Sequence, residues 1–238
     1  MNTIKKAAAD TNGEDRPKTL VEDAYLRLRE DIIEGKYESG ARLRVEHLKD
    51  NYGVGAGTLR EALSLLVADT LVAAEGQRGF SVTPLSLDDL DDLTHTRILL
   101  ETDALRLSLR KGGDDWEAEL VAAFHRLTKV EERFRKTSPR VREWEDRNKG
   151  FHEALIDACG SRWLRHMLAI LYRQAERYRH FSITKGTVRR DIHAEHTEIF
   201  EAALRRDEKR AVEALTQHVD LTRLGIHKMA PDWLRKQP

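Results

Sequence analysis

From about residue 85 onwards, apolar residues recur at helical spacing with few interruptions, and this pattern limits the possible folds more than any other feature. Most of the 14 glycines precede residue 90, so the second part of the chain offers few turns for a sheet. The 238 residues, 40% of them hydrophobic, suffice for two modest cores. The sequence therefore predicts a small mixed domain followed by an all-helical one.

The first part shows the pattern of three short helices. Thr19 stands where an N-cap is expected, before four apolar residues on one helix face: Leu20, Ala24, Leu28 and Ile32. A second helix is predicted at 45–52, and a third opens after the glycine-containing segment 55–57. Two short strands, 71–75 and 80–84, follow around a loop with glycines at both ends. Together these elements predict a winged helix-turn-helix.

This architecture favours DNA binding over the alternative of a scaffold for protein contacts. A recognition helix enters the major groove by its N-terminal end, while a wing tip reaches the neighbouring backbone or minor groove. The formal net charge of the chain is +0, so any basic surface has to be local. The prediction of DNA binding therefore rests on architecture and not on bulk charge.

Two stretches resemble the winged helix of the GntR family of bacterial transcription regulators: "YLRLREDIIEGKYESGARL" and "LKDNYGVGAGTLREALSLLVADTLVAAEGQRGFSVTP". The helical remainder resembles the FCD effector domain of the FadR subfamily, mainly in the positions of its histidines. The resemblance implies a repressor that binds a pseudo-palindromic double-stranded DNA operator as a homodimer. It also implies DNA contacts by Arg60 and by the wing tip, Gln77, Arg78 and Gly79.

The chain departs from the family pattern where DNA contacts are common. Gly55 and Ala56 replace a Ser-Arg or Thr-Arg pair, and Glu46 stands where arginine is frequent. We expect three other residues to compensate: Arg42, Arg44 and Thr58. The operator sequence itself cannot be read from the chain.

The predicted fold class is mainly α. Residues 1–18 are expected to form a disordered arm, 19–84 the winged helix-turn-helix, and 85–230 an antiparallel bundle of six or seven helices. The single cysteine, Cys159, excludes an internal disulfide framework, and no apolar run approaches the roughly 20 residues of a membrane span. We therefore expect a reduced cytoplasmic protein without a membrane partner.

Arg97 and Glu101 fall on the apolar stripe of the first long helix of the bundle, although charged residues belong on the opposite face. They form either a simple ion pair one turn apart or a site in which Arg97 binds a carboxylate ligand. The resemblance favours the second, because an arginine at this position often faces the effector. A further candidate anion-binding set is formed by Arg173, Arg177 and Tyr178, with a merely solvated basic face as the alternative.

Three histidines on three predicted helices point towards the core: His152, His196 and His218. Asn148 lies one turn before the first of them, at a position where the FCD pattern has an aspartate ligand. Neutral imidazoles bind zinc, nickel and similar divalent ions, and helical bundles build such sites from inward side chains. The sequence therefore predicts a metal site at these four residues, with satisfied core histidines as the alternative.

These features predict a regulator whose operator affinity is controlled by a small organic acid bound at the metal site. Two other functions stay open. The first is a metal-sensing regulator, in which the metal ion itself is the signal. A three-histidine zinc hydrolase is less favoured, because no motif supplies a general base.

Overall fold

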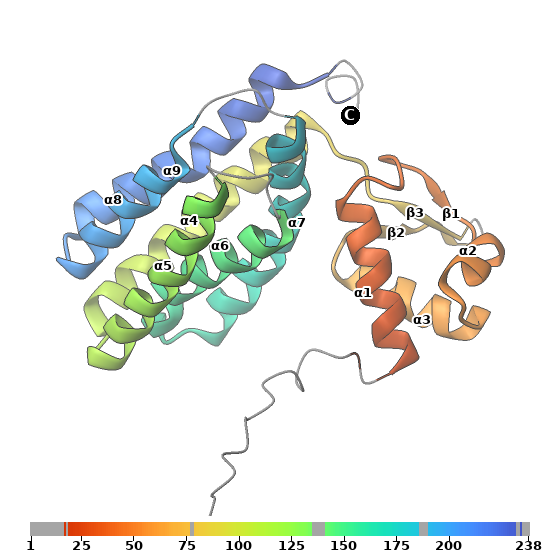
Figure 1. Cartoon of the computed structure of the whole chain (residues 1–238), viewed down its shortest axis with the longest axis horizontal. Coiled ribbons are helices and arrows are strands. Elements are labelled where there is room, and N and C mark those ends of the chain that lie inside the picture. Colours follow the sequence, from red (N-terminus) through yellow and green to blue (C-terminus); the bar gives the residue numbers. More distant parts are fainter. Residues whose placement is uncertain are drawn as a thin grey trace, which may run out of the picture. The chain divides into compact units, whose positions relative to one another are not determined.

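The computed structural model of the chain describes residues 17, 19–76, 79–134, 141–185, 190–231 and 234. The polypeptide forms two compact units, one extending to Val82 and the other beginning at Thr83 (Figure 1). In the part of the chain that is described, no helix is both long enough and apolar enough to cross a membrane. The arm expected at residues 1–18 lies outside the described residues, except for Pro17.

The N-terminal unit has the predicted winged helix-turn-helix fold. Its elements follow the order α1 (Leu20–Ile33), β1 (Arg42–Leu43), α2 (Val45–Tyr52), α3 (Ala56–Ala68), β2 (Val72–Ala74) and β3 (Phe80–Val82). The antiparallel sheet has the strand order β1-β3-β2, with Leu43 paired to Phe80 and Ala73 paired to Ser81. Leu28 and Leu63 belong to the apolar cluster that joins the helices to this sheet.

Local backbone chemistry explains where these helices begin and end. Thr19 is the N-cap of α1, because its side chain accepts a hydrogen bond of 3.0 Å from the amide of Glu22. Gly53 ends α2 in the left-handed conformation, with φ at +67°, which glycine adopts without steric cost. The turn between α2 and α3 thus depends on a glycine at this position.

Two details of this unit differ from the prediction. Helix α3 begins at Ala56, inside the segment expected to precede it, because Gly55 alone keeps the extended backbone of an N-cap. Strand β1 is not among the predicted elements, because two residues are too few to show an alternating pattern. Its pairing with β3 places Arg42 at the edge of the wing.

The C-terminal unit is the predicted all-helical bundle, with six α-helices among the described residues. They are α4 (Leu87–Lys111), α5 (Asp114–Phe134), α6 (Val141–Ile156), α7 (Arg162–Lys185), α8 (Ile192–Leu204) and α9 (Glu208–Met229), with the short 3-10 helix η2 (Asp157–Cys159) after α6. Helix α4 contacts α6, α7 and α9, while α5 contacts α6 and α8. The helices of this unit lie side by side in Figure 1.

In the sequence, Ser86 with Asp89 three residues later predicts the start of α4, and helical spacing predicts a helix over residues 187–204. The first start is confirmed and the second is wrong. Ser86 caps α4 by accepting a 3.1 Å hydrogen bond from the amide of Asp89. Helix α8 begins at Ile192 and not near Thr187, because Asp191 caps it through a 3.2 Å hydrogen bond from the amide of Ala194. Thr187 itself lies outside the described residues.

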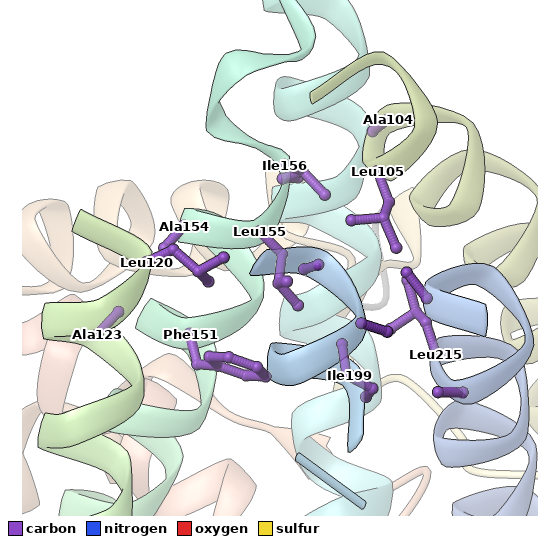
Figure 2. Packing of buried hydrophobic residues seen from close by; sticks show 14 of the residues in the cluster. Ala104, Leu105, Leu120, Ala123, Phe151, Ala154, Leu155, Ile156, Ile199 and Leu215 are labelled. Atoms are coloured by element: carbon purple, nitrogen blue, oxygen red, sulfur yellow. The ribbon is translucent and has the colours of Figure 1, made fainter. Parts of the chain in front are cut away.

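Apolar side chains from α4, α5, α6, α8 and α9 meet in the main core of the bundle (Figure 2). Leu105, Leu120, Phe151, Ile199 and Leu215 are among them. Polar side chains are buried in the same unit, notably Asn148, His152 and His196, each at most 2% exposed. Buried polar groups need partners, so these residues mark the interior site described next.

Candidate functional site

Three arginines and the base of the wing line one hollow on the N-terminal unit. Arg42 lies on β1, Arg44 precedes α2 and Arg60 lies on α3, and together with Gly79 they border a space of about 350 Å³. All three arginines are exposed. Exposed guanidinium groups gathered beside a recognition helix can bind phosphate oxygens or base edges of DNA.

The remaining predicted DNA-contacting residues are placed only in part. Thr58 is half-buried in the first turn of α3, and Gly79 has φ at +90° at the start of the second wing strand. Gln77 and Arg78 lie outside the described residues. Glu46 accepts a 2.7 Å hydrogen bond from Lys49, which lowers the pKa of its carboxyl and keeps a negative charge beside α2.

In the bundle, α6, α8 and α9 bring His152, His196 and His218 together. One ring nitrogen of each lies within 4.8 Å of the corresponding nitrogens of the other two. The ring centroids are 4.6 Å apart for His196 and His218 and 5.2 Å apart for His152 and His218. The structure thus joins three of the four residues predicted to bind metal.

Each imidazole has a carboxylate beside its Nδ1 atom. The distances are 2.6 Å from His152 to Glu101, 2.7 Å from His196 to Glu131 and 2.9 Å from His218 to Glu195. An ionised carboxylate only accepts hydrogen bonds, so Nδ1 carries the proton in His152 and His196, and Nε2 presents its lone pair. Nδ1 of His218 also lies 3.3 Å from Nη2 of Arg190, which is a hydrogen-bond donor. Carboxylates behind metal-binding histidines orient the rings in this manner.

The charges of these groups follow from burial and from their neighbours. Burial is the largest single influence on Glu101 and opposes its ionisation, but Arg97 and His152 together outweigh it through charge and hydrogen bonding and lower the pKa of Glu101 to about 2. Burial likewise opposes ionisation of Glu131. The hydrogen bonds and charges of His196 and His193 more than offset this effect, so the pKa of Glu131 is lower than usual. The carboxyl groups of Glu101 and Glu131 are therefore ionised at neutral pH.

Burial acts on the imidazoles in the opposite direction. It lowers the pKa of His152, and it lowers that of His218 well below the ordinary value for histidine. Both rings are therefore neutral at pH 7, which is the form that binds metal ions.

Three buried polar atoms near these rings have no hydrogen-bond partner among the described residues. They are Nε2 of His152, Nε2 of His196 and Oδ1 of Asn148. The amide nitrogen of Asn148 donates to the hydroxyl oxygen of Tyr172 on α7, which holds the carboxamide in place. Two imidazole nitrogens and an amide oxygen form a donor set that fits a borderline divalent ion such as zinc or nickel.

Arg97 and Glu101 form the expected ion pair, at 2.9 Å and nearly excluded from solvent. Glu101 also contacts Nδ1 of His152, and this contact can orient the imidazole ring. The Arg97 guanidinium lies 5.1 Å from the centre of the Tyr172 ring. Binding of a carboxylate by Arg97 stays a prediction.

The second candidate anion-binding set, which includes Arg173 and Tyr178, does not lie beside the three histidines. The hydroxyl of Tyr178 donates to Asp89 at 2.7 Å, and its ring packs with Leu90 in a separate apolar cluster. Arg173 is half-buried on α7 and does not line the cavity beside His152. The alternative of a solvated face is wrong for Arg177, which is 5% exposed.

A cavity of about 420 Å³ lies beside the histidine cluster. Glu101, His152 and Tyr172 line it at the buried end, and residues of α6, η2 and α7 form the rest of its wall. Cavities of this size accommodate small organic ligands. The side chain of His152 thus forms part of the cavity wall.

Sequence reasoning missed two of the three carboxylates that orient the imidazoles. Glu131 lies on α5 in the apolar stripe that includes Leu127 and Val130. A charged residue at an apolar position of this stripe could have indicated a buried carboxylate. Glu195 is half-buried and offers no comparable signal. Tyr172 was also missed, because a tyrosine at an inward position is typical of any core.

Comparisons with known proteins agree with both units. Residues 20–82 match the model of the family described as bacterial regulatory proteins, gntR family, and residues 92–221 match the FCD domain. The structure resembles that of McbR/YncC from E. coli, with a TM-score of 0.72 and 19% identity over 90% of this chain and 99% of that one. This structural likeness concerns the fold.

Two curated relatives carry the comparison further. BphR of Paraburkholderia xenovorans, described as an uncharacterized HTH-type transcriptional regulator, is 47% identical over 85% of this chain and 83% of its own. GlaR of Escherichia coli, described as an HTH-type transcriptional repressor, is 36% identical over 87% of this chain and 96% of its own. These relatives are regulators and not enzymes. The chain therefore belongs to the GntR family of DNA-binding transcription regulators, with an FCD domain as its C-terminal unit.

Proposed function

We propose that this regulator is a repressor whose operator affinity is controlled by a small organic acid, bound with a divalent metal ion in the FCD domain. One observation carries the proposal: three buried polar atoms, on His152, His196 and Asn148, have no hydrogen-bond partner within the described residues. Each such atom costs about 1–3 kcal/mol when it stays unsatisfied. A metal ion bound by these atoms removes that cost.

Asn148, His152, His196 and His218 would hold the ion, and zinc and nickel suit this donor set. When bound, the ion supplies positive charge and coordination positions for a carboxylate. Asn148 is neutral where the family has an aspartate, so the site keeps one more positive charge than usual. We infer that this favours an anionic ligand.

The residues of this chain then have separate parts in the switch. The three carboxylates hold the imidazoles, and Arg97 pairs with the ligand when it gives up part of its contact with Glu101. The resulting change in helix packing alters the spacing of two winged domains in a homodimer on a pseudo-palindromic operator. Moving the operator from mostly bound to mostly free takes a preference of roughly 5 kcal/mol for one state.

Metal analysis of protein purified without chelator or a metal-affinity tag tests the proposal. Wild-type protein and His125→Ala, a change of an exposed histidine on α5, should retain or take up a transition metal. His196→Ala should bind the metal more weakly and lose the response to organic acids in an operator-binding assay, while operator binding itself persists. Asn148→Asp should bind the metal more tightly, because it adds a formal negative charge.

Two outcomes would contradict the proposal. Wild-type protein with less than about a tenth of an equivalent of transition metal, and no uptake on titration, would make the histidines core residues. Operator release by metal or chelator without any organic acid would instead favour the metal-sensing function.

A further inference from the structure

The cavity beside His152 follows one face of α7 towards the surface. Arg162, His166, Ala169 and Tyr172 line it at helical spacing, and the first and last of them are ten residues apart. At the helical rise of about 1.5 Å per residue, this face is about 15 Å long. Tyr172 is buried, whereas Arg162 and His166 are exposed, so the cavity leads from the interior to solvent.

The middle of the cavity is apolar. Ile156 on α6 and Leu168 on α7 are buried there, and Ala169 is half-buried beside them. These side chains offer no hydrogen bonds, so they suit the hydrocarbon part of a ligand. A polar group in this region would lose its hydration without compensation.

The outer end of the cavity carries one cation that no carboxylate neutralises within the described residues. Arg165 is paired with Asp157 at 2.7 Å, and Glu153 is 3.6 Å from Lys149. The guanidinium of Arg162 lies 5.4 Å from the ring centre of Trp163, a contact that leaves its positive charge available. The cavity therefore has His152 at the buried end, beside a Glu101 carboxylate that is already paired with Arg97, and at the open end an arginine without a carboxylate partner in the described part of the chain.

We infer that this outer end is a second anion subsite, centred on Arg162. The ligand of the cavity is then a dianion: one carboxylate binds at the histidine cluster, an unbranched apolar segment crosses the middle, and a second acidic group reaches Arg162. This inference rests on the proposed function, and it adds the class and the length of the ligand. Short diacids do not reach both ends, so affinity rises with the length of the spacer.

Binding of matched acids to the full-length, zinc-loaded protein tests the inference. Calorimetry would compare butyrate with succinate, hexanoate with adipate, and octanoate with suberate, so that each pair differs only in the second carboxylate. We expect the diacid to bind about fivefold more tightly than its partner in the longer pairs, the upper range for an exposed ion pair. The preference should fall as salt is raised, because Arg162 is exposed.

Three variants locate the effect. Arg162→Gln should abolish the preference for diacids and leave the affinity for monoacids unchanged. Asp157→Asn should increase the preference, because it releases Arg165 from its ion pair. Arg126→Gln, an exposed change on α5 outside the cavity, serves as the control and should leave both affinities unchanged.

The outcomes separate this inference from the proposed function. If monoacids bind and the Arg162→Gln protein keeps the same diacid preference, or if wild-type protein has none, the subsite is overturned and the proposed function stands. If no acid binds to wild-type protein in any pair, the proposed function fails and the subsite fails with it.

Discussion

Single residues in the bundle show how a polar site is kept inside an apolar core. Glu101 comes from α4, Glu131 from α5 and Glu195 from α8, and each faces an imidazole on another helix. The loss of one partner from such a buried pair is costly, because it leaves the other partner uncompensated. The histidines and their carboxylates are therefore best regarded as units, and changes to them should not be additive.

At this scale we predict that acid destabilises the metal-free protein through its buried histidines. Burial lowers the pKa of His218 well below 6.5, whereas the unfolded chain binds a proton near that value. Below pH 6.5 the unfolded state therefore binds more protons, and the free energy of unfolding falls as the pH is lowered. Chemical denaturation at a series of pH values measures this slope.

The variant His218→Gln should flatten the slope, because it removes one group that takes up a proton on unfolding. His125→Ala is the control, since that side chain is exposed. An identical pH dependence in wild type and His218→Gln would contradict the prediction.

At the scale of the elements, glycines in the helix-turn-helix act in two different ways. Gly53 has φ at +67°, whereas Gly57 lies within α3, and an added Cβ atom meets nothing within 4 Å at either position. The backbone conformation alone should thus decide the effect of a substitution. Alanine is strained in the left-handed region and favourable in a helix.

We therefore predict opposite effects of alanine at these two positions. Gly53→Ala should lower the free energy of unfolding by about 1–2 kcal/mol, through strain in the left-handed conformation. Gly57→Ala should raise it by up to about 1 kcal/mol, through the greater helix propensity of alanine. Chemical denaturation of the two variants beside wild type measures both shifts, and shifts of the same sign would refute the argument.

At the scale of the whole molecule, the exposed arginines and the histidine cluster lie in different units of the chain. The formal net charge is +0, so attraction to DNA depends on local groups such as Arg42, Arg44 and Arg60. The histidine cluster lies wholly within the other unit. Substitutions in one unit should therefore separate DNA binding from ligand response.

We predict that Arg60→Ala weakens operator binding by about 1–3 kcal/mol, if its guanidinium reaches a base edge, and leaves metal content unchanged. His196→Ala should show the reverse pattern. A footprint of wild-type protein should cover two half-sites whose centres are about one helical turn apart or less. Unchanged operator affinity of Arg60→Ala at physiological salt would remove Arg60 from the DNA contacts without affecting the fold.

Much of the fold was predictable because local chemistry sets it. Thr19 and Ser86 cap their helices where the sequence indicates, since a cap depends on residues within one turn. Strand β1 and the start of α8 were not predictable from their own residues. The first needs its partner strand, and the second depends on which of several polar residues becomes the cap.

The sequence by itself determined the helix faces, because helical periodicity assigns each residue to a face. It therefore determined which polar side chains point inwards: Asn148, His152, His196 and His218. Only the tertiary structure decided which groups meet. Glu101 and His152 are 51 positions apart, and Glu131 and His196 are 65 apart. Such contacts depend on how whole helices pack, and periodicity within one helix carries no information about the rotation or the depth of its neighbour.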